Sequence, residues 1–174
     1  SRKKDVSFEE FYAFDSSTFT LFSEVMKGVG RNRKDDGKKK GGLKVHMLTD
    51  IHADTAVFAT ISEAKMHDKK FLAHLNPAKG SMLVFDKAYN FYQQFADWTR
   101  EGVNFVCRLK DNAKAQLQEV LFEKNLTKEE FGVYKIGHIH LEYKREKKPE
   151  TLCLRLVYYK DEKGRKYKFI TNNW

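Results

Sequence analysis

Two short apolar runs that each end on an aspartate constrain the fold of this chain more than any other feature. Met82 to Phe85 is uninterrupted apolar sequence, and Asp86 follows it directly. Such a run is typical of a strand buried on both faces. The helical spacing of Phe91, Phe95 and Trp98 predicts an amphipathic helix just downstream. In open α/β sheets ligands bind beyond the carboxyl ends of strands, which is where Asp86 would lie.

The second run has the same design. Phe11 to Phe14 leads into Asp15. If the two strands are neighbours, Asp15 and Asp86 converge although 86 − 15 = 71 positions separate them. Two unpaired carboxylates at close range repel and raise the pKa of one of them, and a divalent cation removes that conflict. The alternative for Asp86 is a helix cap that accepts a backbone N–H.

Composition bounds the class of protein. The 174 residues suffice for one sizeable core, and 41% hydrophobic residues exclude a disordered chain. The net charge of +9 favours a polyanionic partner, nucleic acid above all, although basic proteins with other partners are as common. No apolar run approaches the ~20 residues of a membrane span, and no secretory signal opens the chain. Cys107 and Cys153 lie in apolar strand-like runs, which predicts buried free thiols in a reducing compartment.

The order of predicted elements indicates the fold class. We expect an α/β fold whose first part contains these elements in order: a strand at 11–15, a hairpin of strands at 43–50 and 56–61, a short helix bearing Phe71 and Leu72, the strand before Asp86, a helix ending near Gly102, a strand at 103–109, and a helix bearing Ala113, Leu117, Val120 and Leu121. Three strands that can pair antiparallel, followed by strand–helix–strand, form a ribonuclease H-like pattern. In that pattern the first and fourth strands are neighbours.

The last third of the chain changes to a two-residue period. The segments 133–143, 151–160 and 166–171 alternate and predict strands, with a charged loop at 144–150 and a turn at 160–165. We therefore predict a ribonuclease H-like core with a mixed five-stranded sheet at 1–122 and a β-rich insertion at 123–174. Both ends of the sequence suggest that it is a piece of a longer protein.

The motifs, taken in order, resemble the DDE transposases of bacterial insertion sequences, most closely the insertion-sequence-four group. The matching stretches are Phe14-Asp15-Ser16-Ser17, Gly42-Leu43-Lys44-Val45-His46, His67-Asp68, Phe85-Asp86-Lys87-Ala88-Tyr89 and Phe105-Val106-Cys107-Arg108-Leu109-Lys110. Lys87 and Ala88 depart from the Arg and Gly that are usual in the second aspartate motif. The resemblance covers nearly the whole chain.

The resemblance implies a metal-dependent enzyme that cleaves DNA at element ends and transfers the strands. Asp15 and Asp86 would be the catalytic ligands of Mg²⁺ or Mn²⁺, with Asp15 bridging two ions. The family's third carboxylate is a Glu in a helix, which we expect after Trp174. Tyr143-Lys144-Arg145-Glu146 is similar to that motif but lies in the wrong place. This piece alone is therefore expected to be inactive.

DNA contacts are expected from cationic residues near the metals. Lys44, His46, Arg108 and Lys110 are the candidates, together with Arg31 and Arg33 in a basic loop; a solvated role is the alternative for the lysines and the loop. The resemblance also implies double-stranded DNA as partner, a homodimer on DNA, and a bacterial cytoplasmic, nucleoid-associated location without membrane contact.

Two other function classes stay open. One is a ribonuclease H-like nuclease of another kind, and the other is a non-catalytic basic module in which both aspartates are caps. His138 and His140 share a strand face, but no third ligand accompanies them, so a zinc site is disfavoured.

Overall fold

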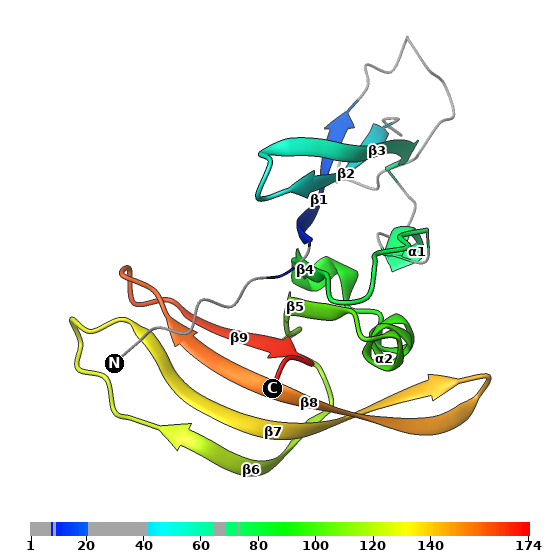
Figure 1. Cartoon of the computed structure of the whole chain (residues 1–174). Coiled ribbons are helices and arrows are strands. Elements are labelled where there is room, and N and C mark those ends of the chain that lie inside the picture. The colour runs from blue at the N-terminus through cyan, green and yellow to red at the C-terminus, as the bar shows by residue number, and fades with distance from the viewer. Residues whose placement is uncertain (1–7, 9, 21–41, 65–68, 73) are drawn as a thin grey trace, which may run out of the picture.

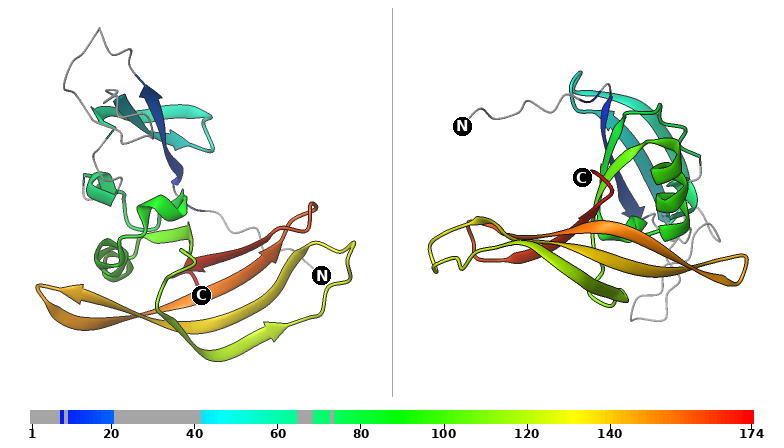
Figure 2. Two further views of the ribbon diagram at one scale, coloured as in Figure 1. Left: turned by 180° about the vertical axis from the view of Figure 1, so that it is seen from behind. Right: turned by 60° about the horizontal axis from the view of Figure 1, so that its bottom comes forward.

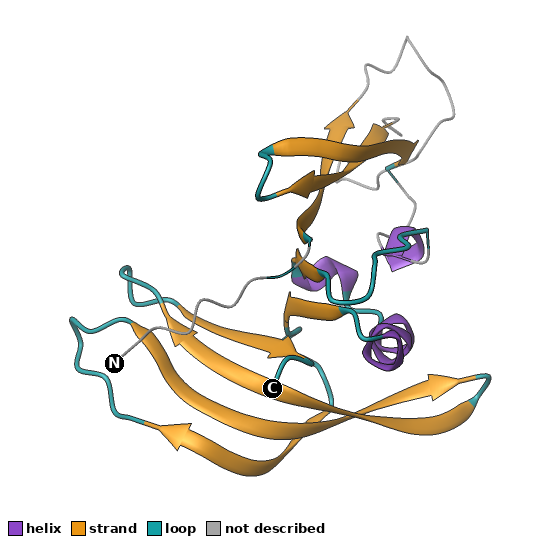
Figure 3. Ribbon diagram, viewed as in Figure 1, coloured by secondary structure: helices purple, strands orange, loops and turns teal. Residues whose placement is uncertain are grey.

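The computed structural model describes residue 8 and residues 10–20, 42–64, 69–72 and 74–174. Strands dominate these residues, with few helices (Figures 1 and 3). In chain order the elements are β1 (Phe11–Thr20), β2 (Gly42–Asp50), β3 (Thr55–Glu63), α1 (Lys69–Leu72), β4 (Met82–Phe85), the 3₁₀ turn η1 (Lys87–Tyr89), α2 (Tyr92–Glu101), β5 (Asn104–Arg108), β6 (Ala115–Glu123), β7 (Gly132–Arg145), β8 (Lys148–Lys160) and β9 (Lys166–Thr171).

All described strands join one sheet in the order β3-β2-β1-β4-β5-β9-β8-β7-β6. β1 pairs antiparallel with β2 and parallel with β4, and β4 pairs parallel with β5. The predicted α/β class and the predicted adjacency of the first and fourth strands are thus confirmed. The sheet is larger than the five strands expected, because β9 pairs antiparallel with β5 and brings β8, β7 and β6 with it. The division of the chain at residue 122 stays a prediction.

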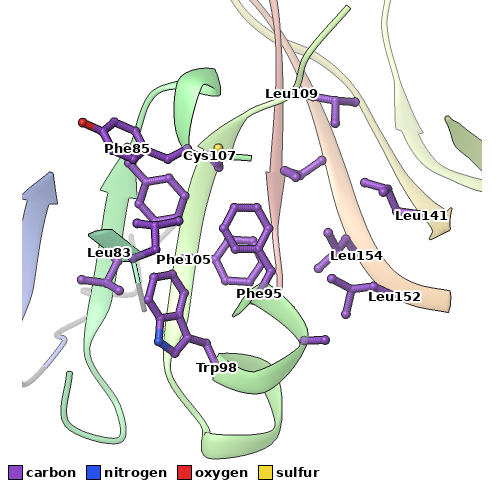
Figure 4. Close-up of a cluster of buried hydrophobic side chains, with 14 of the residues drawn as sticks. Leu83, Phe85, Phe95, Trp98, Phe105, Cys107, Leu109, Leu141, Leu152 and Leu154 are labelled. Carbon is purple, nitrogen blue, oxygen red and sulfur yellow. The ribbon is translucent and has the colours of Figure 1, made fainter. Parts of the chain in front are cut away.

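The core lies on one face of this sheet, under α2. The Phe95 ring stacks on Phe105 of β5 at 4.5 Å between centroids and lies 5.4 Å from the Phe85 ring of β4. Figure 4 shows Phe95 between these strands and the leucines of β7 and β8. α2 ends at Glu101, near Gly102 as predicted, because Gly102 caps the helix with φ 75°, a left-handed conformation in which glycine has no Cβ to clash.

The prediction of a helix around Leu117 and Val120 is wrong, because these residues belong to strand β6. Register irregularities lie between Leu117 and Glu119 and between Val120 and Phe122, where β6 pairs with β7. Each bulge adds a residue to the two-residue period of a strand, so the apolar residues fall at spacings of three and four. A bulged strand therefore imitates the helical pattern.

Two local predictions also need correction. The charged loop predicted at 144–150 is a tight hairpin, in which Glu146 and Lys147 have φ of 49° and 69° between β7 and β8. These positive values suit a two-residue turn between twisted strands. The helix after Asp86 does not begin at once, because η1 comes first.

Some predictions fall outside the described residues, namely those for Arg31, Arg33 and the His67-Asp68 pair. Within the part of the chain that the structure describes, no helix is both long enough and apolar enough to cross a membrane.

Candidate active site at the ends of β1 and β4

The parallel register of β1 and β4 brings the two predicted aspartates to neighbouring positions. The last parallel pair joins Phe14 to Phe85, and Asp15 and Asp86 are the next residue on each strand. Phe14 and Phe85 are buried at 2% and 5% exposure, whereas both aspartates are exposed. Because side chains alternate along a strand, the aspartates belong to the face opposite the aromatic core.

The helix-cap alternative for Asp86 is not supported by its contacts. Asp86 precedes η1, but its side chain makes no capping hydrogen bond. Its backbone is extended, with φ −78° and ψ 168°, so the strand direction continues through it. Asp15 accepts a hydrogen bond from the Ser16 amide at 2.7 Å through Oδ1. Each exposed carboxylate thus keeps oxygen lone pairs for a ligand.

Arg108 is the third member of this row. β4 and β5 pair in parallel with Phe85 opposite Cys107, and Arg108 follows Cys107 as Asp86 follows Phe85. Three adjacent strands therefore present Asp15, Asp86 and Arg108 at equivalent positions. An arginine beside two carboxylates offers a planar set of N–H donors to a phosphate.

A shallow hollow lies beside Asp86. Its lining residues are Asp86, Lys87, Ala88, Lys110, Asp111 and Asn112. The Lys87 ammonium lies 3.4 Å from the Asp111 carboxylate, and both side chains are substantially exposed. Lys110 therefore lines the same hollow as Asp86, and its contact with DNA stays a prediction.

Asn90 holds this region together, and sequence reasoning missed it. Its Nδ2 donates to the Arg108 carbonyl at 2.9 Å and contacts the Cys107 sulfur at 2.9 Å. Its Oδ1 accepts hydrogen bonds from the Tyr92 hydroxyl at 3.1 Å and the Lys110 amide at 3.3 Å. One side chain thus ties the segment after Asp86 to the end of β5. The only hint in the sequence is a polar residue between Tyr89 and Phe91.

The two cysteines differ, against the prediction that both are buried. Cys107 is buried and Cys153 is exposed. Burial raises the pKa of the Cys107 thiol, and the negative charge of Asp86 raises it further. Cys107 therefore stays a neutral thiol and is unsuited to nucleophilic attack.

His46 does not reach the surface. It is 0% exposed, its ring stacks on Phe71 at 3.6 Å, and its Nε2 lies 3.3 Å from the Ser62 hydroxyl oxygen. The prediction that His46 contacts DNA is therefore wrong, since its ring packs in the core. Lys44 shares this face of β2 by alternation, whereas Asp15 pairs with Met47 on the other face. A DNA contact by Lys44 stays a prediction.

Asp15 and Asp86 fit a hard divalent cation in chemical type, because Mg²⁺ prefers carboxylate oxygens and keeps several waters. Among the described residues, no three His, Cys, Asp or Glu side chains group closely enough to hold a metal ion. Two carboxylates therefore supply part of a ligand set. His138 lies 3.3 Å from the Glu119 carboxylate. Among the described residues, His138 and His140 are not part of any group of three side chains that could hold a metal ion.

Comparison with known families agrees with the motif order. The family model described as a transposase DDE domain matches residues 6–168, which is nearly the whole chain. A search of curated proteins found no match to the chain.

Proposed function

The chain belongs to the family of transposase DDE domains, and on that premise we propose that it carries out metal-dependent cleavage and strand transfer of DNA at the ends of an insertion sequence. Asp15 and Asp86 are the metal ligands in this proposal. The observation that supports it best is the β1–β4 register, which sets both exposed carboxylates directly after the Phe14–Phe85 pair.

The carboxylates would hold Mg²⁺ or Mn²⁺ on the open face of the sheet. Bound there, a divalent cation stabilises charge on the attacking and leaving oxygens of a phosphodiester. Phe14 and Phe85 fix the strand ends by packing in the core. Because rigid strands carry both aspartates, the ligands need little reorganisation when the metal binds.

The neighbouring cations position the DNA. Arg108 would donate N–H groups to a phosphate beside Asp86, and Lys110 would add positive charge at the adjoining hollow. Such contacts orient the DNA backbone without reading sequence. They also offset the repulsion between phosphates and the two carboxylates.

The finer assignments are part of the same proposal. They are the insertion-sequence-four-like group, double-stranded element ends and target as substrate, a homodimer on DNA, and a bacterial cytoplasmic, nucleoid-associated location. We also propose that the 174-residue chain is inactive in strand transfer. No third ligand side chain joins the two aspartates among the described residues.

Isothermal titration with Mn²⁺ tests the metal site. Asp15→Asn and Asp86→Asn should each abolish or strongly weaken binding, because each removes a charged ligand while keeping the shape of the side chain. Asp54→Asn is the matched control, since Asp54 is exposed at the β2–β3 turn with φ 50°, which Asn tolerates. If the two site variants bind Mn²⁺ as the control does, the proposal fails.

A further inference from the structure

A cluster of cations and aromatic rings lies beside the candidate site. We call Arg108, Arg165, Tyr167 and Phe169 the Tyr167 patch. The guanidinium carbons of Arg108 and Arg165 lie 4.9 Å and 5.9 Å from the centre of the Tyr167 ring. The rings of Tyr167 and Phe169 stack at 6.1 Å with an interplanar angle of 28°. Both rings are partly exposed.

The patch shares the open face of the sheet with the aspartates. β5 and β9 pair Cys107 with Ile170 and Arg108 with Phe169. Cys107 and Ile170 are 0% exposed in the core beneath α2, so alternation directs Arg108 and Phe169 to the opposite face. No described helix covers that face (Figure 2). One row therefore runs from Asp15 through Asp86 and Arg108 to Phe169.

The charges of the patch suit an anionic ligand. The Arg165 side chain is 64% exposed and is bonded to Asp161 at 2.7 Å. Asp161 also accepts a hydrogen bond from the Tyr167 hydroxyl at 3.2 Å, which fixes both groups in place. A cation held over an aromatic ring keeps its outer N–H groups for another partner. With a net charge of +9 on the chain, a polyanion is the complementary occupant.

The rings of Tyr167 and Phe169 favour single-stranded over double-stranded nucleic acid. Aromatic residues two apart on a strand, flanked by cations on a sheet face, suit bases that stack and phosphates that pair. A duplex hides its base faces inside its own stack. The patch therefore fits an unpaired strand better than a double helix.

We propose that the Tyr167 patch binds single-stranded DNA next to the two aspartates. Arg108 and Arg165 hold phosphates, and Tyr167 and Phe169 stack on bases. This inference rests on the proposed function and deepens it, because it names the form in which DNA lies beside the carboxylates.

Fluorescence anisotropy with labelled oligothymidine, with and without its complement, tests the proposal in EDTA, where metal binding has no influence. The wild type should bind the single strand more tightly than the duplex. The double variant Tyr167→Leu/Phe169→Leu should lose about ten-fold or more in single-strand affinity, since base stacking contributes about 1–3 kcal/mol per base. Tyr167→Phe keeps the ring and should keep most of the affinity.

A matched charge control comes from the same strand. Lys168 is exposed and lies over Tyr158, a residue on the other face of the sheet. Arg108→Gln should reduce the magnitude of the salt slope by about 0.7, the value for one phosphate contact on a single strand. Lys168→Gln should leave that slope nearly unchanged. Equal losses in the two variants mean non-specific attraction and overturn the proposal.

Two further results overturn it: duplex binding as tight as single-strand binding, or full affinity in a double leucine variant. If the double leucine variant does not fold, the comparison of Arg108→Gln with Lys168→Gln still decides. Mn²⁺ titration separates this inference from the proposed function. If Asp15→Asn loses Mn²⁺ binding and keeps oligothymidine binding, both proposals stand. If Asp15→Asn binds Mn²⁺ as the wild type does, only the proposed function fails.

Discussion

Phe14 of β1 and Phe85 of β4 are parallel partners, and both rings are buried in the same core. Phe85 lies 5.4 Å from Phe95 and 6.0 Å from Trp98 between ring centroids. The candidate site is therefore built on top of the core, and each aspartate is one residue beyond a buried aromatic anchor.

Truncating an anchor should be costly. Phe85→Ala should lower the free energy of unfolding by about 3–5 kcal/mol, because it removes a buried ring and leaves a cavity. Phe85→Leu should cost clearly less and keep Mn²⁺ binding, since it fills much of the space. Urea denaturation measures both losses. Equal stability of the alanine variant and the wild type would show that the ring is not packed as described.

Asn90 should act as a positioning residue. Asn90→Ala should destabilise the fold by about 1–3 kcal/mol, because buried partners lose their hydrogen bonds. It should also weaken Mn²⁺ binding, because the segment after Asp86 is no longer tied to β5. Asn104→Ala is the control, since Asn104 makes one 3.3 Å bond to the Ser81 carbonyl at the opposite end of β5. The same change in Mn²⁺ affinity in both variants argues against a positioning role.

Sequence patterns predicted the parts of this molecule that depend on local regularity. The apolar runs before Asp15 and Asp86 form strands, and their order gave the correct adjacency. The pattern failed at β6, where bulges changed the spacing of apolar residues. The burial of His46 was also not predicted. The alternation of residues in β2 shows which side chains share a face of the sheet, but it does not show which face a helix covers. That information comes from Phe71, which is distant in sequence.

The contacts around Asn90 and Tyr167 were invisible for a related reason. Asn90 joins elements on either side of α2, and Arg108 meets Tyr167 across strands that are far apart in the chain. Asn90 belongs to no periodic motif, and the alternation of residues 166–171 predicts a strand at Tyr167 without showing which side chain lies opposite it. Side-chain contacts of this kind follow from register, which only the paired strands define.

Cys107 should make stability depend on alkaline pH. Burial raises its pKa above the ordinary value of 9.0, so the folded state keeps the proton while the unfolded state releases it. The contribution of the Cys107 thiol to the free energy of unfolding is therefore full below about pH 9, and it declines as the pH rises toward the pKa of the folded state. Tyr92, whose pKa burial raises to about 12, adds a similar decline at higher pH. Cys107→Ala should flatten the loss of stability between pH 9 and 10, measured by urea denaturation across pH.

Thiol labelling checks the same environment. The exposed Cys153 should react rapidly with a thiol reagent in the native protein, and Cys107 should react only on unfolding. Cys153→Ser supplies the matched control, because its native state should then show no fast reaction. Rapid labelling of that variant would contradict the buried position of Cys107.

Gly137 should be intolerant of a side chain, because β6 crosses it closely. A Cβ there would lie 2.6 Å from the Glu119 carbonyl oxygen and 2.6 Å from the Leu117 side chain. Gly137→Ala should therefore displace β6 and cost about 1–3 kcal/mol of stability through overpacking. Hydrogen exchange should quicken in residues 115–123 and stay unchanged in β4 and β5, because β6 pairs with β7 at the sheet's edge. If hydrogen exchange in residues 115–123 is as slow in the variant as in the wild type, β6 does not pack closely against Gly137.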